Sequence, residues 1–156
     1  MYKRILVPVD GSQTSTLGLS EAIKLSKDQK AKLRLIHVVD ELIISGGLDG
    51  AAYYPGNLIE DLREEGKNIL KAAETLVQKS SLNFDSVMLE DFGGQQTAGL
   101  IVGDAKKWKA DLIVLGTHGR RGMKRLVMGS DAEEIVRTSP VPILLVRSKS
   151  PDKLAT

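Results

Sequence analysis

A basic, glycine-rich segment, GTHGRRGMKRLVMGS at residues 116–130, has the residue types and spacing best suited to chemistry in this chain. Four glycines are interspersed with four Arg or Lys residues and one histidine, between an apolar run and an amphipathic stretch. Because glycine lacks a Cβ, its backbone N–H can approach a phosphate closely, and a helix start adds unpaired N–H groups and partial positive charge. The segment is therefore either an anion-binding loop or a polar turn, and its spacing alone leaves both open.

The polar side chains of this segment fit both interpretations. Arg120 and Arg121 offer charge-assisted hydrogen bonds to a phosphate, and Ser130 offers its amide and its hydroxyl. Ser130-x-x-Glu133 is also a capping box, so Ser130 is predicted to be the N-cap of the last helix whether or not a ligand binds. The Walker motif is absent, which excludes a P-loop. The absence of Gly-x-Gly-x-x-Gly after the first apolar run argues against a dinucleotide site.

Few other residues suggest chemistry of their own. His37 lies within an apolar run and is predicted to be a hydrogen-bonded structural residue. His118 lies in the glycine-rich segment, where it could touch phosphate, but no catalytic triad accompanies it. With two histidines and no cysteine, a transition-metal site is not expected. Trp108 is predicted to be part of the core, and Tyr53 and Tyr54 either cover a ligand or anchor their loop.

The elements that must position these residues alternate along the chain. Five short apolar runs are predicted strands, and because most lack strict alternation they are typical of a parallel sheet covered on both faces. Stretches with three-to-four apolar spacing lie between them and are predicted helices, which indicates an α/β domain. Ligands in such sheets bind beyond the carboxyl ends of strands where strand order reverses. Residues 7–12 and the glycine-rich segment follow the first and fourth strands, so they would face one crevice if those strands are neighbours. The predicted strands are residues 4–9, 33–39, 86–89, 112–116 and 142–147, and the predicted helices follow Ser12 and include residues 59–77, 97–108 and 132–136.

Composition limits the class of protein. The 156 residues suit one domain, and 42% hydrophobic with 27% charged residues is typical of globular proteins. A net charge of +2 is too small for whole-surface attraction to nucleic acid or membrane. We find no cysteine, signal segment or apolar run of ~20 residues, so we expect a cytoplasmic protein without disulfides that spans no membrane. The long connection at residues 40–57 is either a lid or a disordered insertion.

Several motifs together resemble the universal stress protein family. They are the opening RILVPVDGS, then IHVVD, ADLIVLGTHGRRG and GSDAEEIVRTSPVPILLVR, with the spacing Gly116-x2-Gly119-x9-Gly129-Ser130 of the family's ATP-binding branch. The resemblance covers nearly the whole chain. It implies an open, five-stranded parallel sheet in order 3-2-1-4-5 with helices on both faces, of the adenine nucleotide alpha hydrolase-like type. It also implies a single domain at residues 1–148, followed by a polar tail at 149–156.

The resemblance further implies a binding site for ATP with Mg²⁺. Asp10 is the family's acidic residue at the end of the first strand, near the ribose or the metal-bound phosphates. Asp131 departs from the family, where this position is often apolar, and would repel a triphosphate unless Mg²⁺ lies between. Residues 93–96, Gly-Gly-Gln-Gln, depart as well, since many members have a small residue and proline there. The implied contacts are Pro8, Val9 and Asp10 under the adenosine, Val38 at the adenine, Leu115, Gly116 and Thr117 along the ribose, and Gly119, Gly129, Ser130, Asp131 and Ala132 at the triphosphate.

The resulting hypothesis is an ATP-binding regulatory protein of the stress response that acts as a nucleotide-dependent switch on a protein partner still to be identified. The candidate moving parts are residues 40–57 and 119–128. We see no positioned base for attacking water, so catalysis is not expected beyond slow hydrolysis. The alternatives are a slow Mg²⁺-dependent ATPase or nucleotidyl transferase, a dimeric adaptor that binds no nucleotide, and nucleic-acid binding through the basic cluster, which the small net charge disfavours.

The last predicted strand bears on assembly. Residues 141–146, VPILLV, are strongly apolar and carry a proline near their start, which edge strands tolerate. An exposed apolar edge invites pairing with a second chain, and a two-fold copy of the same strand would cover it. We therefore expect a homodimer through residues 141–147, as the family resemblance also implies.

Overall fold

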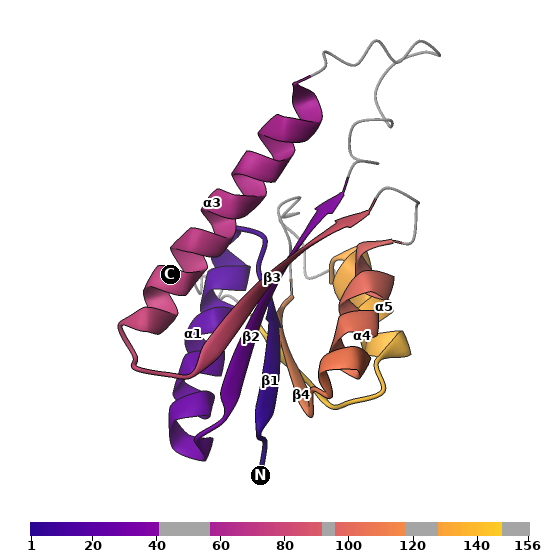
Figure 1. Ribbon diagram of the computed structural model, residues 1–156. Coiled ribbons are helices and arrows are strands. Elements are labelled where there is room, and N and C mark those ends of the chain that lie inside the picture. Colours follow the sequence, from indigo (N-terminus) through magenta and orange to yellow (C-terminus); the bar gives the residue numbers. More distant parts are fainter. Residues whose placement is uncertain (41–56, 92–95, 118–127, 148–156) are drawn as a thin grey trace, which may run out of the picture.

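The structure is a computed structural model that describes residues 1–40, 57–91, 96–117 and 128–147 (Figure 1). Its centre is a five-stranded sheet in the order β3-β2-β1-β4-β5. All four strand pairings are parallel. This confirms the predicted α/β fold and strand order. The strands are β1 (Arg4–Pro8), β2 (Lys32–Asp40), β3 (Phe84–Asp91), β4 (Leu112–Gly116) and β5 (Ile143–Val146), and the helices are α1 (Gln13–Gln29), α3 (Leu58–Gln78), α4 (Thr97–Trp108) and α5 (Ser130–Thr138).

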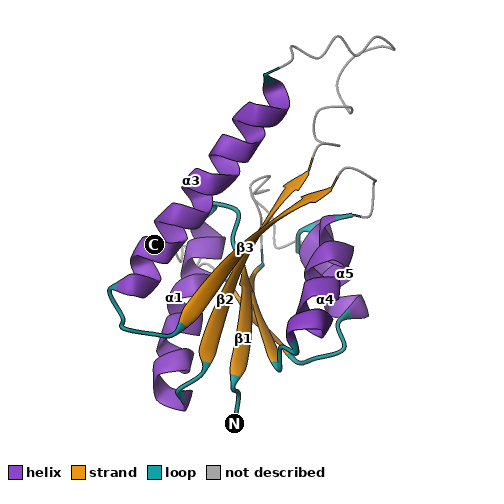
Figure 2. Ribbon diagram, viewed as in Figure 1, coloured by secondary structure: helices purple, strands orange, loops and turns teal. Residues whose placement is uncertain are grey.

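Helices cover both faces of the sheet, with α1 and α3 on one face and α4 and α5 on the other (Figure 2). Side chains alternate along each strand and so divide between two cores. On β1, Ile5 and Val7 pack with α1 and α3, whereas Leu6 packs with α4 and α5. All three are at most 1% exposed. This burial on both sides explains why the central strands read as unbroken apolar runs.

The edge strand β3 is longer than predicted. The apolar run indicated residues 86–89, but the strand extends over Phe84–Asp91 and pairs with β2 along its whole length. Two of the extra residues, Asp85 and Glu90, are charged and form ion pairs with neighbouring elements. Asp85 bonds Arg34 at 2.6 Å and Glu90 bonds Arg63 at 2.9 Å. At the other edge, β5 is shorter than the predicted run and covers Ile143–Val146.

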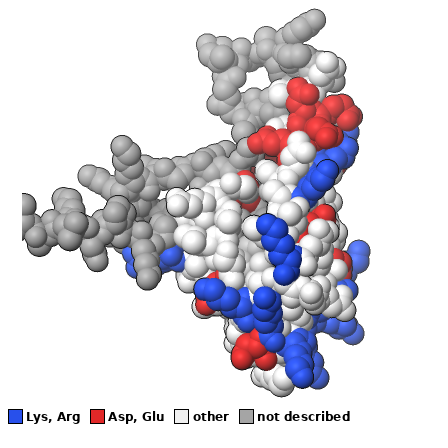
Figure 3. Space-filling view, turned by 90° about the vertical axis from the view of Figure 1, so that its left-hand side faces the viewer, with Lys and Arg blue, Asp and Glu red and all other residues white. Residues whose placement is uncertain are grey.

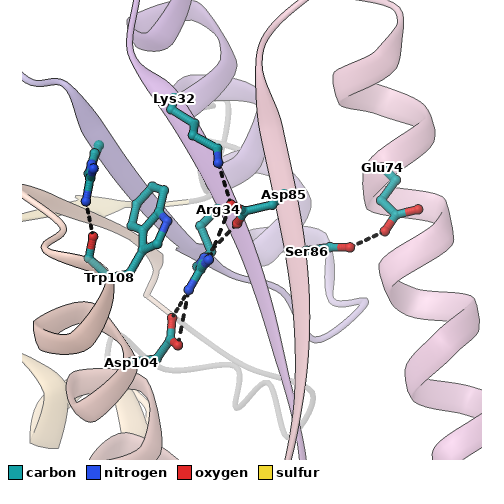
Figure 4. A network of polar contacts seen from close by, with 8 residues as sticks. Lys32, Arg34, Glu74, Asp85, Ser86, Asp104 and Trp108 are labelled. Carbon is teal, nitrogen blue, oxygen red and sulfur yellow. Dashed lines mark hydrogen bonds and ion pairs between the residues drawn. The ribbon is translucent and has the colours of Figure 1, made fainter.

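The amino-terminal end of the sheet is held by a charged network around an indole ring (Figure 4). The Arg34 guanidinium lies 4.8 Å from the centre of the Trp108 ring and bonds Asp104 at 3.3 Å. Burial raises the pKa of the Asp85 carboxyl, but hydrogen bonds from Arg34 and Lys32 outweigh this and hold that pKa below its ordinary value. Trp108 is 9% exposed, which confirms its predicted place in the core. The network ties β2, β3 and α4 together.

Within the ranges that the structure describes, no helix combines the length and the apolar character needed to cross a membrane.

Candidate functional site

The candidate site lies beyond the carboxyl ends of β1 and β4. These two strands are neighbours in the sheet, with Ile5 opposite Leu112 and Leu6 opposite Ile113. The chain leaves β1 toward α1 on one face and leaves β4 toward α5 on the other (Figure 1). Strand order therefore reverses between them, and this is where open parallel sheets bind ligands. Residues 7–12 and the glycine-rich segment therefore follow two neighbouring strands, as the sequence-based prediction of a shared binding site required.

The turn between β1 and α1 fixes the position of the Asp10 carboxylate. Its Oδ1 accepts the Ser12 N–H at 2.9 Å, and its own N–H donates to Ser15 Oγ at 3.2 Å. Ser12 is the N-cap of α1 and accepts the Ser15 N–H at 3.1 Å. Gly11 turns the chain with φ +79°, a conformation that glycine adopts without strain. Within the described residues Asp10 Oδ2 accepts no hydrogen bond, so this oxygen can accept from a ligand hydroxyl or coordinate a cation.

The two ends of the glycine-rich segment meet at the end of β4. Thr117 is buried, and its N–H donates to the Val146 carbonyl on β5 at 3.0 Å. Its carbonyl accepts the Gly129 N–H at 3.1 Å. Residues 117 and 129 are thus held together, and α5 begins directly at Ser130, at the carboxyl end of the sheet. The predicted contacts Gly119, Arg120 and Arg121 lie outside the described residues.

The predicted N-cap of α5 is wrong by one residue. Gly129 is the N-cap, with extended backbone and no side-chain capping bond, and Ser130 is the exposed first residue of the helix. The Gly129 carbonyl accepts the Glu133 N–H at 2.9 Å. The physical reason is tertiary: the bond from Gly129 to Thr117 sets where the helix starts, which moves Ala132 rather than Glu133 to the third helical position. The Ser130 hydroxyl is therefore not used as the helix cap.

The start of α5 has the properties of an anion site. The first N–H groups of any helix lack partners within the helix, and here they belong to Ser130, Asp131 and Ala132. The helix dipole adds partial positive charge. Asp131 is exposed in this first turn, where its charge suits the dipole but opposes a bound phosphate. A cation between the two would remove that repulsion.

Side chains from three strands form an apolar platform beside this helix start. Leu115 and Val38 belong to the core on the α4 and α5 face, and Pro8 shares that face because it lies two residues beyond Leu6. Val9 has its side chain on the opposite face, buried against α1 and α3. Sequence reasoning overlooked two further members of the platform region, Leu89 and Met128, which pack against the same core. Leu89 could have been inferred as the neighbour of Val38 on β3.

Gly116 has a packing role that sequence reasoning missed. A Cβ built on Gly116 would lie 2.6 Å from the Thr14 carbonyl carbon and oxygen, so only glycine lets α1 approach β4 this closely. Gly18 on α1 faces the same contact, and a Cβ there would lie 3.2 Å from the Gly116 nitrogen. Gly18 lies inside α1, where a glycine destabilises a helix by about 1 kcal/mol relative to alanine. This unfavourable choice was the sequence signal for a close contact of α1. Gly116 is required here whether or not a ribose binds beside it.

A separate cavity of 320 Å³ lies between α1 and α3 on the opposite face. Its lining is mostly apolar and includes Leu19, Ile69 and Leu76. On this face the acidic side chains gather at the start of α3, whereas Lys and Arg side chains lie further along it (Figure 3). Acidic groups near the carboxyl ends of the strands disfavour phosphate on this face of the sheet.

Cation binding at the site would depend on the ligand. Among the described residues, no group of three or more His, Asp or Glu side chains is arranged to hold a metal ion. Asp10 is the predicted protein ligand for Mg²⁺, and that ion commonly takes its other oxygens from substrate phosphates and water.

His37 has the structural role that the sequence predicted. Its Nδ1 lies 2.7 Å from the Val9 carbonyl oxygen, which confirms the predicted hydrogen bond.

An open parallel sheet whose strand order reverses between β1 and β4, with helices on both faces, defines a doubly wound α/β protein. The model of the universal stress protein family matches residues 1–147, and the chain belongs to that family.

Similar proteins share most of their length with this chain. Universal stress protein MJ0531 of Methanocaldococcus jannaschii is 35% identical over 148 residues, covering 94% of this chain and 83% of that protein. Universal stress protein YxiE of Bacillus subtilis is 30% identical over 152 residues, covering 94% and 100%. Among solved structures, MJ0577 of Methanocaldococcus jannaschii superposes with a TM-score of 0.81 at 26% identity, over 96% of this chain and 99% of that one.

More distant solved structures share the fold and contain adenine nucleotides. One universal stress protein in complex with cAMP is 22% identical with a TM-score of 0.65, and one from Archaeoglobus fulgidus in complex with dAMP is 20% identical with a TM-score of 0.67. A family member from Arabidopsis thaliana with AMP bound is 12% identical with a TM-score of 0.67. At these identities the likeness to our chain is a likeness of fold.

Proposed function

We propose that this chain binds an adenine nucleotide, ATP with Mg²⁺, in the crevice between the β1–α1 turn and the start of α5. The observation that carries the proposal is the closure of the glycine-rich segment by the 3.1 Å bond from Gly129 to Thr117. This bond places the helix start and both ends of the segment at the order reversal of the sheet.

Each predicted contact has a chemical role in this proposal. Pro8, Val38 and Leu115 would support the flat adenine ring on the apolar platform. Asp10 Oδ2 would accept a ribose hydroxyl or coordinate Mg²⁺. The N–H groups of Ser130 and Ala132 would donate to phosphate oxygens, joined by Gly119, Arg120 and Arg121 from the segment outside the described residues. Val9 would face the nucleotide with its main chain, because its side chain is buried on the opposite face of the sheet.

The nucleotide-bound relatives support the adenine part of this proposal. Family members of the same fold contain cAMP, dAMP and AMP, three ligands that share an adenine ring, a pentose and one phosphate. The length of the phosphate chain is the further step that we propose for this protein. Its support is the pair of features suited to several phosphates, namely the spacing of the glycines and the basic residues between them.

The direct test is calorimetry with ATP, ADP, AMP and cAMP, with and without Mg²⁺, on the wild type and Gly129→Val. Gly129 has φ −63° and ψ 149°, which valine adopts readily, so the variant should fold. We expect ATP affinity to fall at least about tenfold, because the branched side chain blocks the approach of phosphate. Gly103→Ala is the matched control, since a Cβ at Gly103 meets nothing within 4 Å. No heat with any nucleotide would refute the proposal and favour a dimeric adaptor.

We also propose that the protein is a regulatory switch rather than an efficient enzyme. Bound and free forms would differ in their affinity for a protein partner, as any ligand-driven switch requires. ATP turnover measured beside the calorimetry separates the alternatives. We expect turnover close to the uncatalysed background, and fast hydrolysis abolished by Asp10→Ala would instead establish a Mg²⁺-dependent ATPase.

The assembly that we propose is a homodimer through residues 141–147. Strand β5 lies at the edge of the sheet, and Leu144 and Leu145 are 37% and 38% exposed although both are large and apolar. Val136 on the neighbouring helix is 42% exposed. A second copy would cover this surface. Sedimentation of the wild type and Leu144→Lys tests it: we expect a dimer that the charge dissociates, and a wild type that stays monomeric at all concentrations would exclude it.

A further inference from the structure

His37 connects helix α3 to the main chain of the candidate site. It is 6% exposed on β2, and its Nδ1 lies 2.7 Å from the carbonyl oxygen of Val9. Because a carbonyl oxygen can only accept, Nδ1 must carry the proton in this bond. The Val9 N–H is also used, donating to the Ile36 carbonyl at 2.8 Å. The peptide groups that lead into Asp10 are thus fixed from two sides, once by the sheet and once by this imidazole.

The other side of the imidazole is pressed against α3. A Cβ built on Gly66 would lie 2.9 Å from His37 Cδ2, 3.0 Å from Met88 Sδ and 3.2 Å from Val39 Cγ2. Glycine in a helix interior is unfavourable, so its place in the 21-residue helix α3 needs a packing reason. The reason is that α3 lies directly on His37, with no room for a methyl group between them.

About one helical turn further along, helix α3 contacts the β1–α1 turn directly. Ile69 lies at Gly11, where a Cβ would be 3.3 Å from Ile69 Cγ1. Gly66 and Ile69 are three residues apart and so project on one face of the helix. Through His37 the helix acts on Val9, and through Ile69 it acts on Gly11. Asp10, the residue between them, carries the predicted ligand-binding carboxylate.

From these contacts we infer that His37 is a positioning residue for nucleotide binding and that α3, seated on it through Gly66, sets the geometry of the Asp10 turn. The inference rests on the proposed function and adds a role for residues that touch no ligand. It also assigns α3 a regulatory part: a partner that shifts this helix would change nucleotide affinity without entering the crevice. His37 then holds the Val9 carbonyl for the site, not only for the core.

Two isosteric substitutions separate positioning from packing. His37→Asn places its amide nitrogen where Nδ1 was, the same number of bonds from the backbone, so it can still donate to Val9. His37→Leu has the same shape as asparagine but offers no donor. Calorimetry should give an ATP affinity within about threefold of the wild type for His37→Asn and at least about tenfold weaker for His37→Leu.

Stability measured beside affinity gives a readout that a structural role alone would not produce. Leucine suits the buried, apolar surroundings better than asparagine, so His37→Leu should melt at or above the temperature of His37→Asn while binding more weakly. Affinities that follow melting temperatures, with the leucine variant binding at least as well, would overturn the inference. Wild-type protein that binds no nucleotide would instead refute the proposed function, so the two failures are distinguishable.

Gly66→Ala tests the helix side of the same contact. The added methyl group must displace His37 or α3, so we expect ATP affinity to fall several-fold even though alanine favours the helix. Gly103→Ala in α4 is the control, because its Cβ meets nothing within 4 Å and its affinity should match the wild type. Equal affinity of both variants, with α3 still folded by circular dichroism, would remove α3 from the proposed coupling.

Discussion

The two ends of the sheet are stabilised in different ways. At the amino end, long charged side chains bond one another across β2, β3 and α4 (Figure 4). Arg34 pairs with both Asp85 and Asp104, and its guanidinium lies over the Trp108 ring. At the carboxyl end, the Arg63–Glu90 ion pair lies at the edge strand β3, whereas the contacts of Thr117 and Gly116 are main-chain bonds and glycine approaches. The first end satisfies its own charges. The second contains the start of α5 and the Asp10 carboxylate, where we propose that a nucleotide binds.

This difference teaches how one sheet can combine stability with binding. Charged side chains that pair with each other are less available to a ligand, so they suit the amino end. Main-chain bonds and glycines hold the backbone in place without covering it, so they suit the end where we propose that a nucleotide binds. Substitutions at the two ends should therefore separate stability from nucleotide affinity.

The largest effect on the free energy of unfolding is expected at Gly116, at the carboxyl end of β4. In Gly116→Ala the new Cβ would lie 2.6 Å from the Thr14 carbonyl, a main-chain group that cannot rotate away. We expect the free energy of unfolding to fall by at least about 3 kcal/mol, since α1 must separate from β4. Urea unfolding measures it, with Gly103→Ala as the control that should be stabilised by up to about 1 kcal/mol. A variant as stable as the wild type would show that α1 moves freely on β4.

The next largest effect is expected at the amino end. Arg34→Met removes the partner of Asp85 and Asp104, and the Asp104 side chain is 10% exposed. We expect a loss of about 1–3 kcal/mol, smaller than for a fully buried pair because water reaches part of the network. Nucleotide affinity should stay at the wild-type value, because the network lies at the opposite end from the crevice. A loss of affinity equal to that of Gly129→Val would contradict the division between the two ends.

The pH dependence of stability should report the same network. The pKa of Asp85 lies below its ordinary value in the folded protein, so this carboxyl stabilises the fold above its unfolded pKa, and the contribution is lost as pH falls through the folded pKa. The difference in unfolding free energy between the wild type and Asp85→Asn should therefore be full at pH 7 and shrink below about pH 4. Urea titrations at several pH values measure it. A difference that grows on acidification would reverse the assigned direction.

The sequence predicted what depends on local pattern. Unbroken apolar runs predicted β1 and β4 because both faces of these strands are covered, and the two strands are neighbours in the sheet, as a shared binding site would require. It predicted less well where distant partners decide. The ends of β3 were missed because Asp85 and Glu90 are charged and interrupt the apolar pattern. Their ion-pair partners, Arg34 and Arg63, lie far away in the chain.

The site shows the same division between local and tertiary information. The capping box predicted Ser130 as the N-cap of α5, but the N-cap is Gly129, whose N–H bonds the Thr117 carbonyl. The glycine at 116 was assigned to a ligand, yet the carbonyl of Thr14 alone requires it. Motif spacing identifies which segments meet, whereas the contact that makes each residue necessary belongs to the folded chain.

The smallest effect is expected at Asp131, and it tests the carboxyl end alone. An acid in the first turn of α5 gains roughly 0.3–1 kcal/mol from the helix dipole, so Asp131→Ala should cost little stability. Toward a bound triphosphate the same charge is repulsive unless Mg²⁺ screens it. The ratio of ATP affinities with and without Mg²⁺ should therefore be several-fold smaller in Asp131→Ala than in the wild type, whereas Glu134→Ala in the next turn, whose carboxylate pairs with Arg137, should leave that ratio unchanged. An unchanged ratio in Asp131→Ala would mean that this carboxylate faces away from the phosphates, and the helix N–H groups would then bind them without help from the cation.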